Sequence, residues 1–134
     1  MMTPHEQVLN NLYSAISAGA TGGGLAVFWH PDAEQVEYPS LMRPNGHRRS
    51  LADMIEGSFL GAKIIREQQY DVHTVIEDGD EVAVQLTWTA TVASDLGTIT
   101  AGTPLVAHVA AFYVFRDGLI LRQSSYDCYE PIAR

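Results

Sequence analysis

The sequence contains one cysteine, Cys128, so no disulfide can form within the chain. A lone thiol is typical of a reducing compartment, and we expect a cytoplasmic protein. Basic residues are also scarce: 8 lysines and arginines stand against 16 acidic residues, which gives a net charge of -8. This charge repels phosphate backbones and anionic headgroups, so nucleic acid and membranes are not expected partners. No run reaches the ~18 apolar residues that a membrane-spanning helix needs.

Motifs for metals and nucleotides are missing too. The five histidines include no His-x-His or His-Glu-x-x-His spacing, and the single cysteine lacks a partner for a metal site. Gly22-Gly23-Gly24 has no expected strand before it and no Gly-Lys-Ser/Thr after it, so we interpret it as a linker. The sequence therefore predicts a protein without a metal or a cofactor.

What the sequence does contain is typical of a packed domain. Hydrophobic residues make up 46% and charged residues 18% of the 134 residues, and no internal repeat is present. A chain of this length buries about two-thirds of its unfolded surface. We expect residues 1–134 to form a single domain.

Three helices are predicted in the N-terminal half. Thr3-Pro4-His5-Glu6 combines a capping box with proline at the first helical position, and Ser50 with Asp53 resembles another helix start. Pro31 restricts the residue before it and so ends a short helix. The expected elements are a helix from Thr3 to Gly19, a short helix from Leu25 to Trp29, an edge strand from Ala33 to Tyr38, a loop, and a helix from Ser50 to Gly61.

From Lys63 onward the apolar residues alternate, as in half-buried strands. The clearest alternation runs from Val82 to Val92, and Glu77-Asp78-Gly79-Asp80 and Arg116-Asp117-Gly118 mark hairpin turns. The last four strands, ending with Leu105 to Phe115 and Leu119 to Tyr129, are expected to form an antiparallel meander. These patterns predict an α+β fold in which the helices cover one face of the sheet.

Several segments resemble a known superfamily. Phe28-Trp29-His30-Pro31-Asp32, Val36-Glu37-Tyr38-Pro39 and Phe115-Arg116-Asp117-Gly118-Leu119-Ile120, in this order of elements, are similar to the nuclear transport factor 2-like superfamily. Ala107 to Phe112 and Gln123 to Pro131 resemble its SnoaL-like, ketosteroid isomerase-like subgroup. The resemblance implies a cone-shaped fold with a bent antiparallel sheet, a pocket for a small hydrophobic molecule, and a homodimer. Members include isomerases, polyketide cyclases, dehydratases, epoxide hydrolases and non-catalytic binding modules, so function must be argued from the site.

The chain departs from two characterised patterns of this superfamily. Ketosteroid isomerases place their basic aspartate where this sequence has Tyr38, and their first-helix tyrosine falls on Leu12, beside Tyr13. Limonene epoxide hydrolases carry an arginine and an aspartate where this sequence has Leu86 and Trp88. Their tyrosine and a nearby amide are matched by Tyr38 and Ser40. The ordinary chemistry of either group is therefore disfavoured.

The final strand carries the best candidate for catalysis. Leu121, Gln123, Ser125 and Asp127 alternate on one face, which the resemblance places toward the pocket. Burial there would raise the pKa of Asp127 and suit it to general acid or base catalysis. The alternative is a structural carboxylate that accepts a hydrogen bond from a backbone amide or a tyrosine.

The position of His108 depends on the turn before the last strand. A two-residue loop would pair His108 with Asp127 and create a dyad able to move a proton at neutral pH. A three-residue loop from Arg116 to Gly118 would place His108 on the opposite face. The resemblance favours the second arrangement, which leaves His108 as a structural or dimer-face residue.

The leading hypothesis is a cofactor-independent isomerase, cyclase or dehydratase that uses Asp127 as its acid or base. The residues expected to bind substrate are Tyr13, Tyr38, Ser40, Trp88, Gln123 and Ser125. The alternative is a non-catalytic ligand-binding or dimerisation module. A dimer surface is expected on the outer sheet face, and its predicted members are Phe112, Val114, Ile120 and Tyr126. His47-Arg48-Arg49, the one basic cluster, is interpreted either as a docking point for a carboxylated substrate or as a solvated loop.

Overall fold

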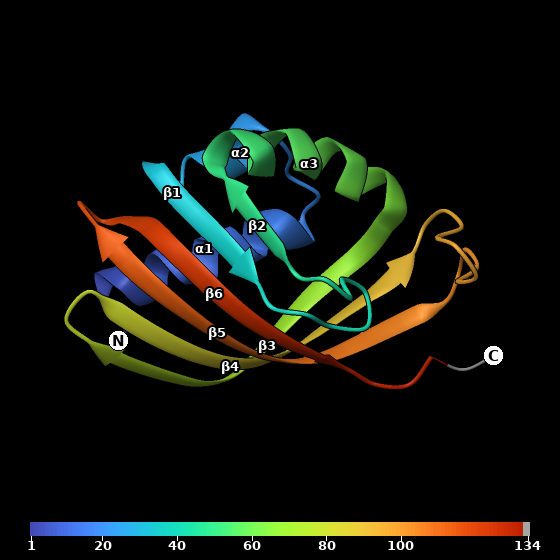
Figure 1. Ribbon diagram of the computed structural model, residues 1–134. Coiled ribbons are helices and arrows are strands. Elements are labelled where there is room, and N and C mark those ends of the chain that lie inside the picture. Colours follow the sequence, from blue (N-terminus) through green and yellow to red (C-terminus); the bar gives the residue numbers. More distant parts are fainter. Residues whose placement is uncertain (133–134) are drawn as a thin grey trace.

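The computed structural model describes residues 1–132 and shows helices packed on one curved sheet (Figure 1). The elements are α1 (Pro4–Ser17), α2 (Gly23–Ala26), β1 (Trp29–Glu37), β2 (His47–Ser50), α3 (Leu51–Ile64), β3 (Ile65–Asp78), β4 (Glu81–Val92), β5 (Pro104–Arg116) and β6 (Leu119–Tyr129). The strands lie in the order β2-β1-β6-β5-β4-β3, and only β1 with β6 is a parallel pair. The predicted α+β class and the meander are confirmed, while the parallel pair makes the sheet mixed.

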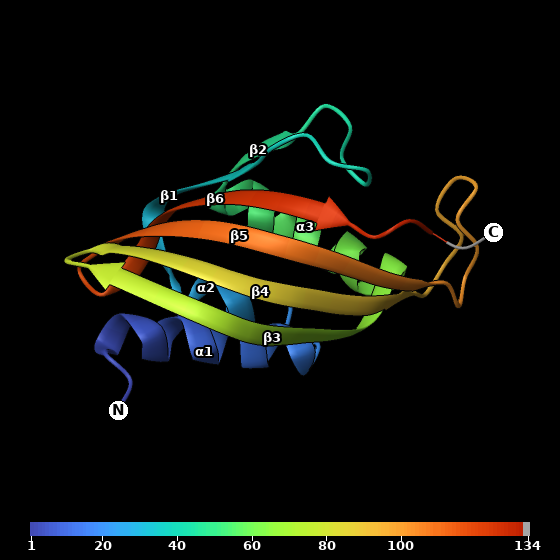
Figure 2. The same cartoon turned by 90° about the horizontal axis from the view of Figure 1, so that it is seen from below.

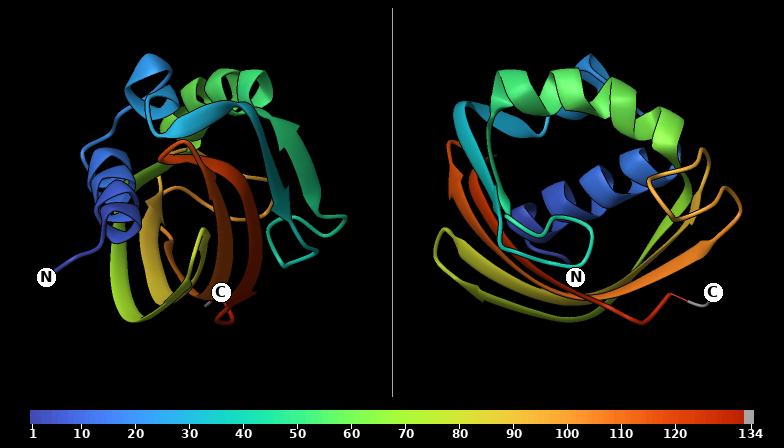
Figure 3. Two further views of the ribbon diagram at one scale, coloured as in Figure 1. Left: turned by 90° about the vertical axis from the view of Figure 1, so that its left-hand side faces the viewer. Right: turned by 45° about the vertical axis from the view of Figure 1, so that its right-hand side comes forward.

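The sheet is bent, and its concave face looks toward the helices (Figure 3). Helix α1 packs beside β3, whereas α3 contacts β1, β2 and β3. One core joins the two layers and includes Leu9 and Leu12 of α1 with Val82, Leu86 and Tyr113 of the sheet. Because each fully buried side chain of this size contributes roughly 1.5–3 kcal/mol, the core holds the helices over the concave face. The convex face of the sheet points away from α1 and α3 (Figure 2).

The helix starts follow the predicted caps. Thr3 Oγ1 accepts a hydrogen bond from the Glu6 amide at 3.2 Å, and Ser50 with Asp53 forms a reciprocal capping box. Helix α3 continues past its predicted end at Gly61 to Ile64, because the residues that follow Gly61 favour helix and the chain then passes directly into β3. Within residues 1–132, no helix has both the length and the apolar character to cross a bilayer.

The segment around β1 differs from the prediction. Helix α2 begins within the glycine segment that was interpreted as a linker and ends at Ala26, and its N-cap Gly22 has a φ of 54° that favours glycine. Trp29 begins β1 instead of ending a helix. Pro31 is tolerated in this strand because the pairing of β1 with β6 is irregular between Trp29 and Glu34. The strand predicted from Ala33 to Tyr38 is present as part of β1, but its predicted position at the sheet edge is wrong. Strand β2 forms from the predicted loop and pairs with the free side of β1.

The turn between β5 and β6 has two residues, Asp117 and Gly118, with φ of 54° and 76°. Positive φ at both positions is the conformation of a type I′ turn, which matches the twist of a hairpin. This is the shorter of the two loops that the sequence allows. If the β5/β6 ladder were regular beyond this two-residue turn, His108 would pair with Asp127.

A β-bulge in β6 changes that pairing. Leu121 is an extra residue between two consecutive pairs of the β5/β6 ladder. It shifts the rest of the ladder by one position, so His108 pairs with Cys128 and lies on the face opposite to Asp127. The bulge also leaves Ile120 fully buried in the core, whereas a regular alternation predicted it on the outer face. Leu121 itself, predicted to face the pocket, does not line it.

Candidate active site

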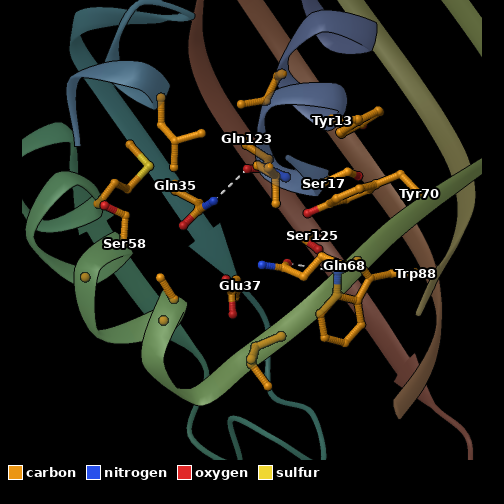
Figure 4. Close-up of a pocket in the computed structure, with 18 of the residues that line it drawn as sticks. Tyr13, Ser17, Gln35, Glu37, Ser58, Gln68, Tyr70, Trp88, Gln123 and Ser125 are labelled. Carbon is orange, nitrogen blue, oxygen red and sulfur yellow. Dashed lines mark hydrogen bonds between the residues drawn. The ribbon is translucent and has the colours of Figure 1, made fainter. Parts of the chain in front are cut away.

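A cavity of about 870 Å³ lies between the concave face of the sheet and the helices, and every helix and strand contributes to its lining. Sites for small molecules usually enclose about 300–1,000 Å³. Much of the wall is apolar, with side chains such as Leu12, Met54 and Val109. Polar side chains gather along β1 and β6, as the close-up shows (Figure 4).

One row of polar side chains crosses four neighbouring strands. Arg49 of β2, Gln35 of β1, Gln123 of β6 and Tyr113 of β5 occupy directly paired positions. Because side chains alternate along a strand, pairing in register turns all four toward the concave face. The position of β1 between β2 and β6 therefore assembles residues that are far apart in the sequence. We call this set the polar row.

Hydrogen bonds connect the polar row from end to end. Arg49 donates to Gln35 Oε1, and Gln35 Nε2 donates to Gln123 Oε1 at 2.7 Å. Gln123 Nε2 donates to the Tyr113 hydroxyl at 3.2 Å, and this hydroxyl lies 2.6 Å from that of Tyr13 on α1. The two phenols carry two hydrogens and share one hydrogen bond, so one phenolic hydrogen remains to be donated to a ligand.

Both phenols are protonated at neutral pH. Burial raises the pKa of Tyr13 to about 12 and raises the pKa of Tyr113 well above its ordinary value. Tyr70 stacks on Tyr13 with ring centroids 4.6 Å apart, and burial raises its pKa as well. This end of the cavity is thus a set of neutral donors, which is suited to hold a carbonyl oxygen that gains negative charge.

A carboxyl group lies farther along β6. Ser125 and Asp127 follow Gln123 at alternate positions and also line the cavity. Burial raises the pKa of Asp127 and the nearby Glu37 adds to the rise, while a hydrogen bond from the Ser125 hydroxyl to Oδ1 opposes it. The raised pKa brings proton exchange by Asp127 closer to neutral pH.

A second carboxylate, Glu37 of β1, lies next to Ser125 in the β1/β6 ladder and also lines the cavity (Figure 4). Its Oε1 is 3.5 Å from Arg49 Nη2, and its Oε2 is 3.9 Å from Arg43 Nε. Among residues 1–132, by contrast, Ser125 supplies the one hydrogen bond to the Asp127 side chain. Glu37 is therefore balanced by cations, whereas Asp127 is available for proton transfer.

Aromatic side chains form another part of the wall. Trp88 of β4 is paired with Tyr70 of β3 and packs edge-on against Tyr129, with ring centroids 6.2 Å apart. The Trp88 indole Nε1 donates to Gln68 Oε1 at 3.2 Å, which fixes the ring (Figure 4). Aromatic side chains held in this way can pack against a planar molecule.

Five predicted site residues line the cavity: Tyr13, Trp88, Gln123, Ser125 and Asp127. The period of two holds along β4 and along β6 beyond its bulge, and this places the strand residues on the predicted face. The structure thus brings the predicted polar edge of the last strand into the cavity. The catalytic and binding roles of these residues stay predictions.

Three predicted site residues do not line the cavity. His108 is on the convex face, where its Nε2 lies 3.0 Å from Glu130 Oε2, so no dyad with Asp127 forms. Tyr38 stacks on Tyr126 of that face, because the alternation along β1 turns its neighbour Glu37 inward instead. Ser40 lies in the loop after β1, where its hydroxyl accepts a hydrogen bond from the Arg43 amide.

Five residues of the site were not among the predicted site residues: Gln35, Glu37, Arg49, Tyr70 and Tyr113, although the basic cluster that contains Arg49 was interpreted either as a docking point for a carboxylated substrate or as a solvated loop. Tyr113 could have been found, since it follows Ala107 and Ala111 at even spacing on β5. The other four depend on neighbours that the sequence does not specify. Arg49 in particular enters the site only because its segment forms a strand rather than a solvated loop.

Comparisons with known proteins agree with this architecture. The family model described as SnoaL-like domain matches residues 9–123. The structure of AclR, a proposed hydroxylase from Streptomyces galilaeus, has a TM-score of 0.73 and 23% identity, covering 95% of this chain and 80% of that chain. IdmH, a proposed polyketide cyclase from Streptomyces antibioticus, has a TM-score of 0.73 and 20% identity, covering 94% and 92%.

A further structure is that of a proposed polyketide cyclase from Xanthomonas campestris pv. campestris, with a TM-score of 0.75 and 20% identity over 92% of this chain and 89% of that chain. At these identities the likeness shows a common fold. No curated protein matches the sequence.

Proposed function

Because the chain belongs to the SnoaL-like domain family, we propose that it is a cofactor-independent enzyme that moves protons on a small hydrophobic or polyketide-like molecule. Isomerisation, aldol-type cyclisation and dehydration each need a proton moved at a carbon or an oxygen of the substrate. The observation that carries the proposal is the Asp127 carboxyl, which is partly buried in a cavity that also presents neutral phenolic donors. The names of IdmH and the Xanthomonas protein support the same class of chemistry.

In the proposed reaction, Asp127 acts as the base. The substrate C–H bond next to a carbonyl group breaks, its proton forms an O–H bond on Asp127, and the electron pair moves to the carbonyl oxygen. The free phenolic hydrogen of the Tyr13/Tyr113 pair stabilises that oxygen. Return of the proton from Asp127 to another carbon of the substrate completes an isomerisation. In a cyclisation the enolate carbon instead forms a bond to a second carbonyl carbon, whose oxygen takes the proton from Asp127.

The spacing of these groups limits the substrate. Asp127 is four residues from Gln123, which adjoins the phenols, so their Cα atoms are about 13 Å apart along β6. The Asp127 carboxyl group and the phenolic hydroxyls both extend into the cavity, so the space between them is shorter than this Cα separation. A molecule of about two fused rings, packed against Trp88, fits between base and donors in a cavity of about 870 Å³.

A ligand screen followed by turnover tests this proposal. Compounds from a library of ketones and polyketide fragments that raise the melting temperature are selected and then assayed for conversion. We expect Asp127→Asn to lower the turnover of a converted compound by about 10²-fold or more, since it removes the base. Glu130→Gln is the matched control, because Glu130 follows β6 but is exposed and contacts His108. Full turnover by Asp127→Asn refutes the assigned role.

A second candidate is a non-catalytic binding module. It is favoured by the hydrogen bonds that join Tyr13, Tyr113 and Gln123 to one another, since these bonds hold the three side chains in place without a ligand. The same screen separates the two: a module gives compounds that stabilise the fold but undergo no conversion by wild type.

We also propose that the protein is a cytoplasmic homodimer. The single cysteine, exposed on the convex face, suits a reducing compartment. Phe112, Tyr126 and Tyr38 are 50%, 45% and 37% exposed and contact one another through two ring pairs. We call these three side chains the convex patch, and we propose that a second copy of the chain covers it.

A further inference from the structure

Strand β2 divides the basic cluster His47-Arg48-Arg49 between two environments. His47 and Arg49 alternate toward the cavity side, whereas Arg48 points outward and binds Glu34 at 2.7 Å. The side chain of Arg49 is 18% exposed, compared with 63% for Arg48. Burying a guanidinium is costly unless anionic or polar partners surround it, so the inward turn of Arg49 calls for a partner.

The partners present in the protein do not saturate Arg49. Its guanidinium carries five N–H hydrogens but contacts only Gln35 and, at 3.5 Å, Glu37 among the residues that the structure describes. Its buried Nε has no partner within that same part of the chain. Arg43 approaches the same Glu37 carboxylate at 3.9 Å. The two guanidinium groups of Arg43 and Arg49 thus share the Glu37 carboxylate at this corner of the cavity, and one carboxylate cannot occupy all of their N–H donors.

Neighbouring groups support a positive potential here. The pKa of His47 is lowered by burial first and then by Arg49 and Arg43, against the opposite effect of Asp53. Asp53 is also engaged in the cap of α3, where its Oδ2 accepts from the Ser50 amide. Asp53, Glu56 and Lys63 line only the adjoining groove, whereas Arg43 and Arg49 also line the main cavity and can offer guanidinium N–H donors to an anion there.

The corner also has room for a ligand group. A second groove of about 610 Å³ adjoins the main cavity, and both are lined by Arg43, Arg49 and Gly57. The ladder position of Glu37 is one strand across and two residues along from Asp127, a separation of roughly 8 Å. An anionic group bound by the arginines would thus lie about one or two ring widths from the proposed base.

We propose that the cavity takes a molecule with a carboxylate or a similar planar oxyanion, which Arg49 and Arg43 bind while its apolar ring lies over Val109 and Trp88. The proposal rests on the proposed function for its view of this cavity as a substrate site. Planar guanidinium groups hold carboxylates through paired N–H donors, which a neutral ester or amide cannot match. The substrate class is therefore an aromatic or polyketide-like acid.

The test compares 2-naphthoate with 2-naphthamide, which has the same shape without the charge, by isothermal titration and Trp fluorescence. Wild type is expected to bind the acid about 10- to 100-fold more tightly, as charge-assisted hydrogen bonds predict. Arg49→Gln and the more exposed Arg43→Gln are each expected to remove most of this preference. Arg48→Gln is the matched control and keeps it, because Arg48 points away from the cavity.

A further variant is expected to strengthen acid binding, whereas the arginine variants weaken it. Glu37→Gln removes the carboxylate that competes for the two arginines, so it is expected to tighten acid binding and leave amide binding unchanged. The proposal is overturned if wild type binds acid and amide equally or binds neither, or if Arg48→Gln weakens acid binding as much as Arg43→Gln does. Proton transfer on a neutral ketone measures the proposed function separately, so the two failures are distinguishable.

Discussion

Burial of Asp127 in the cavity wall affects both the stability of the fold and the role proposed for this carboxyl group. Burial favours its neutral form, so the folded-state pKa lies above the ordinary value of 3.8. Neutral Asp127 therefore contributes to the free energy of unfolding in full below pH 3.8, and this contribution is lost as pH rises through the folded-state pKa. At neutral pH the protein therefore holds a carboxylate that the fold does not favour, as a general base requires.

Asp127→Asn should raise stability at neutral pH, because asparagine keeps the shape and removes the ionisation. The gain in the free energy of unfolding should grow as pH rises above 3.8 and level off above the folded-state pKa of Asp127, by about 1.4 kcal/mol for each unit by which that pKa is raised. Urea unfolding at a series of pH values measures it. A difference between wild type and variant that does not change with pH, or that shrinks as pH rises, contradicts the assignment.

Tyr113→Phe should be more damaging than Tyr13→Phe. Tyr113 is 2% exposed and connects two partners, so its loss leaves both the Gln123 amide and the Tyr13 hydroxyl without their bonds. We expect a loss of about 1–3 kcal/mol in the free energy of unfolding. Tyr13→Phe removes a single bond and should cost less. If Tyr13→Phe lowers the free energy of unfolding more than Tyr113→Phe does, Tyr113 is not the residue that connects the two partners.

At the scale of elements, the short β1–β2 connection determines whether Arg49 reaches the site. Gly46 ends this connection with a φ of 70°, and a Cβ atom there would lie 2.8 Å from the Glu37 carbonyl oxygen. The contact is with backbone, which cannot move aside without displacing β1. The register that pairs Gln35 with Arg49 therefore depends on a glycine at this position.

Gly46→Ala should lower the free energy of unfolding by more than Gly79→Ala. Gly79 has a φ of 60° but open space around its Cβ position, so its substitution brings only the left-handed strain of about 1–2 kcal/mol. Gly46→Ala adds the clash and should also weaken ligand binding at Arg49. Equal losses for both variants in urea unfolding would contradict this account of the turn.

The sequence predicted those elements whose signals are local. Caps at Thr3 and Ser50 marked helix starts, and strict alternation from Val82 to Val92 marked β4. It did not predict the bulge at Leu121, because pairing on either side of a bulge depends on tertiary packing rather than on one residue type. That single residue decides which of His108 and Val109 faces Asp127 across the ladder.

The missed half of the site has the same cause. A short strand such as β2 has too few residues for its alternation to stand out, so His47 to Arg49 was placed in a loop ahead of the helix start at Ser50. Family positions then assigned Tyr38 to the pocket, although Glu37 is the neighbour that faces it. Cross-strand neighbours, which create the polar row, follow from topology and not from any motif in the chain.

At the scale of the whole molecule, the two faces of the sheet differ in what they present. The concave face encloses the cavity, whereas the convex face carries the convex patch of Phe112, Tyr126 and Tyr38. Ile120 was expected in this patch but is fully buried in the core. The proposed dimer therefore depends on aromatic side chains from β5, β6 and the end of β1.

Phe112→Glu should convert the proposed dimer into a folded monomer, because a charge in an apolar interface opposes association while the exposed site tolerates it in the monomer. Light scattering at micromolar concentration should give twice the chain mass for wild type and the chain mass for the variant. Ile76→Glu, an exposed position near the β3–β4 turn, is the control and should stay dimeric. A monomeric wild type contradicts the proposal.

Exchange of carbon-bound protons with solvent deuterium tests the central claim most directly, because it detects proton abstraction without knowledge of the natural product. The probe is 2-tetralone, a bicyclic ketone with acidic protons, followed by NMR in deuterated buffer. We predict that wild type and Glu130→Gln accelerate exchange, and that Asp127→Asn loses about 10²-fold or more of this acceleration. Exchange that is equally fast with Asp127→Asn, or no faster with wild type than in buffer, would contradict the account.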